Sequence, residues 1–300
     1  ISTFSGNGFK QDADFYVYAY DWRQSIPLQA DLLKFYLDDK IKAAQAELNF
    51  IAHSLGGLVV RSFLDKYGDK YNINKVITLG SPHLGTPLAY PIWEGGLVEY
   101  NDKTIKLAID TLLNYCQMKL VKDDKSIIRA LIPSMKDLFP VFPFLLNEKN
   151  ELIPVSETGN QNLWLQNLNA SNNNFITTAI SGNNISTVDS IRIDNTDAED
   201  VWPDGKPVEN IKTPTGDGTI LLKSAVLPNF DSIIIDNQNH AQIVYSNRAL
   251  NLLFPKLDLQ NIILANEEND NHIRIKSTPS TIEKLQNQVF EWKRYQLKIK

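Results

Sequence analysis

The sequence predicts an α/β fold in which a mostly parallel sheet is covered by helices on both faces. Between residues 15 and 80, segments typical of buried strands alternate with segments typical of amphipathic helices. That order is characteristic of parallel sheets, because a crossover helix must connect each strand to the next. The composition agrees, since hydrophobic residues make up 43% and charged residues 22% of the 300 residues, which is typical of a chain that buries a core.

The first elements lie in the N-terminal part of the chain. A β-rich run over 15–20 precedes a helix predicted for 25–41, which has a proline in its first turn. A short apolar strand over 48–51 leads into a second helix that ends near Gly68. The apolar residues 75–80 predict a third strand.

Regularity is lost between residues 88 and 212, which we interpret as an insertion above the sheet. Helical patterns cover 104–120 and 126–131, and strand-like patterns lie near 175–180 and 190–193. An acidic loop follows the second of these strand-like patterns. We interpret its carboxylates as a solvated surface, and a calcium site is the alternative.

Regular patterns return over 213–256. Residues 233–235 predict a strand, and a helical pattern follows His240. Residues 1–87 and 213–256 therefore form the predicted sheet domain. The charged, weakly patterned residues 257–300 form a predicted C-terminal extension.

Charge, hydropathy and cysteine content argue against several classes of protein. Thirty basic and 35 acidic residues give a net charge of −5, which is not the basic footprint of a nucleic-acid-binding protein. The longest apolar patch, 138–146, is too short to span a bilayer and is interrupted by prolines. The single cysteine, Cys116, cannot form an internal disulfide and belongs to no metal-ligand spacing. We expect neither a metal nor a cofactor.

The most informative stretch is Ala52–Gly57, which sets Ser54 between small residues where an apolar strand gives way to a helix. A serine at such a junction lies on a sharp, strained turn that holds its hydroxyl above the sheet. The N-terminus of the following helix favours negative charge beside it. A small-x-Ser-x-Gly string also occurs by chance, and it is the strand and helix around it that favour a nucleophile.

A serine nucleophile needs a base, and the chain has four histidines. His240 follows a strand and precedes a helix, so it lies on a loop at one end of the sheet and is the favoured base. His53 adjoins the serine, and we expect adjacent side chains on a strained turn to point apart. His83 is interpreted as a loop-shaping or pocket residue, and His272 as a solvated residue of the polar tail.

The base in turn needs a carboxylate that orients it. Asp217 is favoured because flanking glycines allow a tight turn around a buried carboxylate. Asp231 and Asp236 are the alternatives. The order along the chain is then Ser54, Asp217, His240.

Five motifs occur in family order over roughly residues 10 to 255. Together they resemble the lecithin:cholesterol acyltransferase-like α/β-hydrolases, a family of lipases and acyltransferases. They are Tyr20-Asp21-Trp22-Arg23, Ala52-His53-Ser54-Leu55-Gly56-Gly57, Ser81-Pro82-His83-Leu84-Gly85-Thr86-Pro87, Gly216-Asp217-Gly218-Thr219 and the segment around His240. The resemblance implies an α/β-hydrolase fold with Ser54 as nucleophile, Asp217 as acid and His240 as base. It also implies that residues 88–212 form a cap or lid over an acyl-chain pocket.

Further site residues follow from the resemblance. The Leu55 main-chain N–H is one predicted donor to the oxyanion. The second donor belongs to a loop that would precede Ile1, and we interpret the sequence as a fragment or processed form whose N-terminal strands are missing. Trp22 and Arg23 are predicted to border the acyl-chain pocket, and a structural ion pair between Asp21 and Arg23 is the alternative. His83, as a pocket residue, joins Trp22 as a predicted substrate-binding residue.

The predicted function is that of a serine hydrolase that cleaves carboxylic esters of lipids through an acyl-enzyme on Ser54. One alternative is an acyltransferase that passes the acyl group to an alcohol, and another is a non-catalytic binding fragment of a larger protein. The expected partners are a lipid or other ester substrate and a transiently contacted lipid or membrane surface, but not a nucleic acid. The sequence does not fix the compartment, and we favour a secreted location.

Overall fold

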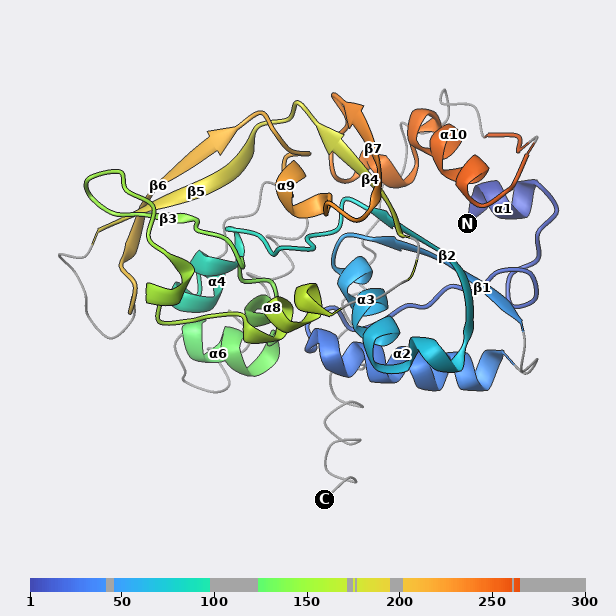
Figure 1. The fold of residues 1–300 in the computed structure, drawn as a ribbon, viewed down its shortest axis with the longest axis horizontal. Coiled ribbons are helices and arrows are strands. Elements are labelled where there is room, and N and C mark those ends of the chain that lie inside the picture. The colour runs from blue at the N-terminus through green and yellow to red at the C-terminus, as the bar shows by residue number, and fades with distance from the viewer. Residues whose placement is uncertain are drawn as a thin grey trace, which may run out of the picture. The chain divides into compact units, whose positions relative to one another are not determined.

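A computed structural model of the chain describes residues 1–41, 46–97, 124–171, 175, 177–194, 202–260 and 262–264 (Figure 1). Residues 1–264 form one compact unit, and the unit beyond it, 265–300, lies outside the described residues. The predicted helix over 104–120 also lies outside them. Within the described ranges, no helix combines the length and the apolarity that crossing a membrane requires.

The central sheet has four strands, and all neighbouring pairs are parallel. Their order across the sheet is β1, β2, β4, β7. The strands are β1 (Glu47–His53), β2 (Asn72–Leu79), β4 (Thr177–Asn183) and β7 (Asp231–Asp236). The predicted parallel sheet is therefore confirmed, and the carboxyl ends of its strands meet at one edge.

Helices cover both faces of this sheet, as predicted. On one face, α2 (Ile26–Lys40) packs against α3 (Leu55–Tyr67), which is buried on all sides along its first ten residues. On the other face, α10 (Asn247–Lys256) packs on apolar side chains of β2, β4 and β7. Figure 1 shows α2 and α3 on one side of the strands and α10 on the other.

A smaller sheet lies beside the central one. In it, β5 pairs with β3 in parallel and with β6 in antiparallel orientation. Its strands are β3 (Leu145–Leu146), β5 (Thr187–Asp194) and β6 (Lys206–Thr213). The remaining described elements are α1 (Ser2–Gly6), α4 (Ala89–Gly95), α6 (Asp124–Leu131), α7 (Ser134–Asp137), α8 (Leu163–Ala170), α9 (Leu222–Ala225) and the 3₁₀ turns η1 (Gly68–Lys70), η2 (Val155–Glu157) and η3 (Gln242–Val244).

The first strand prediction, over 15–20, is wrong. Residues 16–20 form no strand, although Phe15 makes one isolated bridge to Gln11. The tyrosines that suggested a strand pack as side chains instead: Tyr18 stacks on Tyr20, with ring centroids 5.8 Å apart. A strand needs a neighbour to pair with its backbone, and β-propensity alone does not supply one.

The boundaries of the predicted insertion also need correction. The predicted insertion covers 88–212, but β4 lies within this range and is a central strand, hydrogen-bonded to both β2 and β7. At the other end, Leu257, Leu259, Ile262 and Leu264 pack against the α10 side of the core, so the predicted extension over 257–300 begins too early. That the rest of 88–212 acts as a lid stays a prediction.

A side chain distant in sequence holds the N-terminus of α2. Ser25 precedes the helix without making a side-chain capping bond, and Asp137 accepts the Ile26 main-chain N–H at 2.7 Å. Burial disfavours the charged carboxylate and raises the pKa of Asp137 from an ordinary value of 3.8 to about 6.

Replacing this carboxylate, by Asp137→Asn, should change how stability depends on pH. Because the pKa is higher in the folded chain, the contribution of Asp137 is fully present below about pH 4 and is lost as the pH rises through about 6. The free energy of unfolding of the wild type, relative to the variant, should fall by up to about 3 kcal/mol over this range. Urea titrations at several pH values measure the difference, and a difference that does not change with pH would contradict the prediction.

Candidate active site

Ser54 occupies the sharp turn between β1 and α3. Its φ of 54° and ψ of −131° lie outside the regions that non-glycine residues favour, at a cost of about 1–3 kcal/mol. The Ser54 N–H donates to the Leu79 carbonyl at 2.9 Å, which fixes the turn to the end of β2. Small residues permit this close approach: a Cβ on Gly57 would lie 2.1 Å from Ser81 Oγ.

The structure brings the three predicted catalytic side chains together at the carboxyl edge of the sheet. His240 Nε2 lies 2.9 Å from Ser54 Oγ, and His240 Nδ1 lies 2.7 Å from Asp217 Oδ2. Ser54 follows β1, and His240 follows β7. Both distances are those of ordinary hydrogen bonds. The His240 imidazole therefore links the Ser54 hydroxyl to the Asp217 carboxylate.

Asp217 is fully buried and held by the backbone of its own turn. Its Oδ1 accepts the main-chain N–H groups of Thr219 at 3.0 Å and Ile220 at 2.7 Å, which leaves Oδ2 for the imidazole. An ionised carboxylate only accepts, so Nδ1 of His240 carries the hydrogen. Nε2 of the neutral ring is then free to accept the Ser54 hydroxyl proton, which is the arrangement that general-base activation of serine requires.

Two glycines that are not among the predicted site residues make room for this arrangement. A Cβ on Gly80, whose φ is 55°, would lie 2.9 Å from Asp217 Oδ2 and 3.1 Å from His240 Nδ1. A Cβ on Gly182 would lie 2.0 Å from the Gln238 carbonyl oxygen. Both follow apolar runs of central strands, and that position was the signal in the sequence that could have identified them.

The alternative acids have other hydrogen-bonding partners. Asp231 lies at the amino end of β7 and pairs with Lys256 at 2.6 Å. Asp236, at the other end of β7, accepts from the Asn183 side chain at 2.9 Å. The geometry therefore favours Asp217 as the residue that orients the imidazole.

The three remaining predicted site residues differ in their positions. Leu55 begins α3, so its main-chain N–H has no acceptor within the helix and lies next to Ser54. Trp22 is 39% exposed. Beside it, Arg23 donates from Nε and Nη2 to the two carboxylate oxygens of Asp21, each at 2.7 Å, which is the structural ion pair that the sequence left as the alternative.

His83 does not occupy the predicted substrate-contacting position. Its side chain is completely buried, with Nε2 3.1 Å from Thr78 Oγ1 and its ring edge-on to Phe230. Burial lowers the pKa of His83 far below its ordinary value, so the ring is neutral. The sequence pattern shows that His83 follows a strand. It does not show whether the side chain points to solvent or into the core.

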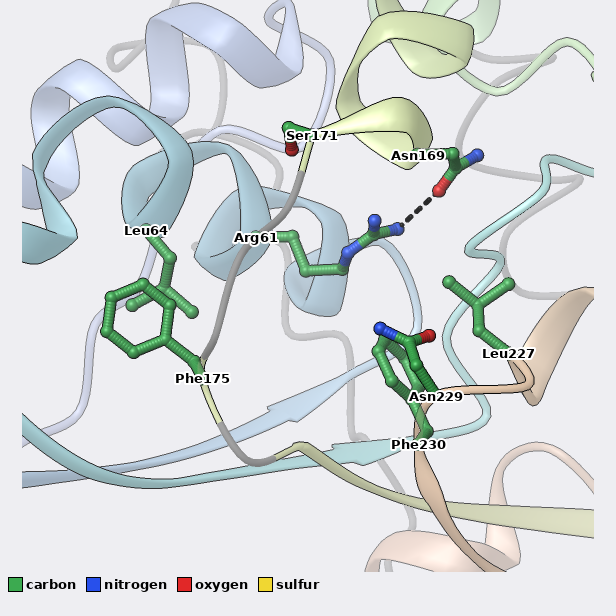
Figure 2. Close-up of a pocket in the computed structure, with 8 residues that line it drawn as sticks. All are labelled: Arg61, Leu64, Asn169, Ser171, Phe175, Leu227, Asn229 and Phe230. Carbon is green, nitrogen blue, oxygen red and sulfur yellow. Dashed lines mark hydrogen bonds between the residues drawn. The ribbon is translucent and has the colours of Figure 1, made fainter.

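A pocket separate from the Ser54–His240 pair lies on the far part of α3 (Figure 2). Arg61 projects into it and donates to Asn169 Oδ1 at 2.9 Å. Phe175 and Phe230 line the pocket; Phe230 immediately precedes β7, and Phe175 lies two residues before the first residue of β4. The pocket therefore lies toward the amino ends of these strands, whereas Ser54 and His240 lie at the carboxyl ends.

Residues 1–203 match the model of a protein family described as lecithin:cholesterol acyltransferase. The chain belongs to the lecithin:cholesterol acyltransferase family. The matched range contains Ser54, while Asp217 and His240 follow it. The resemblance read from the five motifs is thereby confirmed, and the parallel sheet with helices on both faces is the α/β-hydrolase fold expected of a member.

Two curated relatives come from Arabidopsis thaliana. A segment of 94 residues is 33% identical to phospholipase A(1) LCAT3 and covers 29% of this chain and 21% of that protein. A segment of 87 residues is 33% identical to lecithin-cholesterol acyltransferase-like 4 and covers 27% of this chain and 16% of that protein. The matches thus span about a fifth or less of the relatives.

The chain is also similar to solved structures. The mature lipase BlEst2 of Bacillus licheniformis aligns with a TM-score of 0.48 and 15% identity, over 85% of this chain and 82% of that one. A chain of the Tle4–Tli4 complex aligns with a TM-score of 0.49 and 12% identity, over 76% of this chain and 65% of that one.

Proposed function

We propose that this chain carries the catalytic centre of a serine hydrolase that cleaves carboxylic esters of lipids. The observation that supports this proposal most directly is the hydrogen-bonded series from Ser54 Oγ through both nitrogens of His240 to Asp217. The strained backbone at Ser54 adds support, since strain of this kind is kept where function requires it.

In the first half-reaction, Ser54 Oγ attacks the ester carbonyl carbon while His240 Nε2 takes the hydroxyl proton. The carbonyl oxygen becomes an oxyanion, and the Leu55 N–H at the start of α3 donates to it. The carbon–oxygen bond to the leaving alcohol then breaks, and the imidazolium returns its proton to that oxygen. Asp217 stays ionised and stabilises the imidazolium throughout.

The second half-reaction releases the acyl group. Water attacks the acyl-enzyme, His240 takes one of its protons, and Ser54 recovers its hydroxyl as a free fatty acid leaves. An alcohol in place of water would give acyl transfer with the same residues, and the acyltransferase names of the family and of one relative favour this second candidate. The phospholipase name of the other relative favours a lipid ester as acyl donor.

A fluorophosphonate probe tests the proposal because it reacts with activated serines. We expect the wild-type chain to be labelled on Ser54, and Ser54→Ala to remove the label completely. Ser5→Ala, at an exposed serine of α1, is the matched control and should be labelled like the wild type. An unlabelled wild type would favour the non-catalytic binding fragment.

Substrate class and acceptor need a second measurement. Hydrolysis of p-nitrophenyl esters of increasing chain length, and of phospholipid vesicles, should be detectable and should depend on Ser54. Adding a long-chain alcohol to the same assay separates the two functions, since a transferase forms the new ester and a hydrolase releases only fatty acid.

A further inference from the structure

His53, the residue that precedes Ser54, contacts His240. The two ring centroids are 4.6 Å apart, with an angle of 41° between the ring planes. His53 Nε2 lies 3.0 Å from the main-chain carbonyl oxygen of His240. Because a carbonyl oxygen only accepts, Nε2 of His53 carries a hydrogen and donates it.

The surroundings of His53 keep its ring uncharged. Burial, followed by repulsion from His240 when that ring is protonated, lowers the pKa of His53 to about 4, although Asp217 acts in the opposite direction. At neutral pH the ring is therefore a neutral donor. It fixes the neighbouring loop without placing a second positive charge beside His240.

Besides the hydrogen bond between its ring and Ser54 Oγ, His240 is held at three points. Asp217 Oδ2 accepts from its ring, and the Asp217 main-chain oxygen accepts its N–H at 2.9 Å. Both of these contacts tie His240 to the turn at Asp217. Only the third contact, from His53, ties the His240 backbone to the residue that precedes Ser54.

We infer that His53 is a positioning residue that sets the distance between Ser54 Oγ and His240 Nε2 by bonding the backbone of the His240 loop to the serine turn. This inference rests on the proposed function, because it concerns the same reaction. A shift of about 1 Å in catalytic geometry can lower a rate by about a hundredfold. Loss of the donor should therefore act on turnover more than on substrate binding.

Three substitutions separate the hydrogen bond from the ring contact. His53→Phe keeps a ring against His240 and removes the donor. His53→Gln places an amide N–H close to the position of Nε2, and His53→Asn is polar but too short to reach the carbonyl. We expect kcat of the Phe and Asn variants on a p-nitrophenyl ester to fall by about ten- to a hundredfold, with KM changed less than about threefold.

Rescue by glutamine is the decisive result. His53→Gln should recover most of the wild-type kcat and most of its rate of fluorophosphonate labelling. If His53 had a purely structural role, the loss of kcat in each variant would parallel its loss of thermal stability. The melting temperature of each variant is therefore measured alongside. If His53→Phe fails to fold, the comparison of Gln with Asn gives the same test.

The outcomes distinguish this inference from the proposed function. A wild type that is neither labelled nor active refutes the function itself. An active wild type with an equally active Asn variant overturns the role of His53 alone. Equal losses in the Gln, Asn and Phe variants also overturn it, because they would assign the effect to packing of the imidazole rather than to the hydrogen bond.

Discussion

Replacing His240 by alanine should lower kcat for an ester substrate by about a millionfold, which is the scale of loss when the base of a serine triad is removed. Without the imidazole, the Ser54 hydroxyl has no base at 2.9 Å to take its proton, and the leaving alcohol has no acid to protonate it. KM should change little, because the lost interaction develops in the transition state.

The loss should be specific to the imidazole. His272→Ala is the matched control, since it removes a histidine that the sequence places in the polar tail, and it should keep wild-type turnover. Added imidazole should restore part of the activity of His240→Ala by entering the space left by the ring. Retention of more than about a hundredth of wild-type kcat in His240→Ala would contradict a role as the general base.

The site could be predicted from the sequence because each of its residues lies in a distinctive local pattern. Ser54 lies at a strand-to-helix junction, Asp217 lies between two glycines, and His240 follows a strand. Since successive strands of a parallel sheet all end at the same edge, the positions of Ser54 and His240 predict that these two meet there. Asp217 follows β6 of the smaller sheet, so its place beside them is predicted only by its glycine-flanked turn and by the order of the three residues along the chain.

The errors arose where local pattern does not determine tertiary contacts. Residues 16–20 have the composition of a strand, but pairing depends on a neighbour. The strand β4 was assigned to the insertion, because an asparagine-rich stretch precedes it and irregular sequence separates it from β2. The substrate-bordering role predicted for His83 disagrees with the structure for the same reason: side-chain direction at a turn depends on packing that the sequence does not display, and the side chain is fully buried.

Replacing Asp217 by asparagine should lower kcat by about ten-thousandfold while preserving the fold. Asparagine has nearly the same size, and its carbonyl oxygen can still accept the main-chain N–H groups of Thr219 and Ile220. Its amide nitrogen would then face Nδ1 of His240 and donate to it. That donation selects the tautomer with the hydrogen on Nε2, which cannot accept the proton of Ser54.

The matched controls are the two alternative acids. Asp231→Asn removes the ion pair with Lys256 on the surface, and Asp236→Asn changes an exposed bond to Asn183, so both should keep kcat within about threefold. Turnover of all three variants is measured on one ester, and urea unfolding shows whether the buried amide of Asp217→Asn is tolerated. Near-normal turnover in Asp217→Asn, together with a large loss in one of the controls, would assign the orienting role to the aspartate replaced in that control. The reason is that the carboxylate which fixes the tautomer of His240 cannot be replaced by an amide without a large loss of turnover.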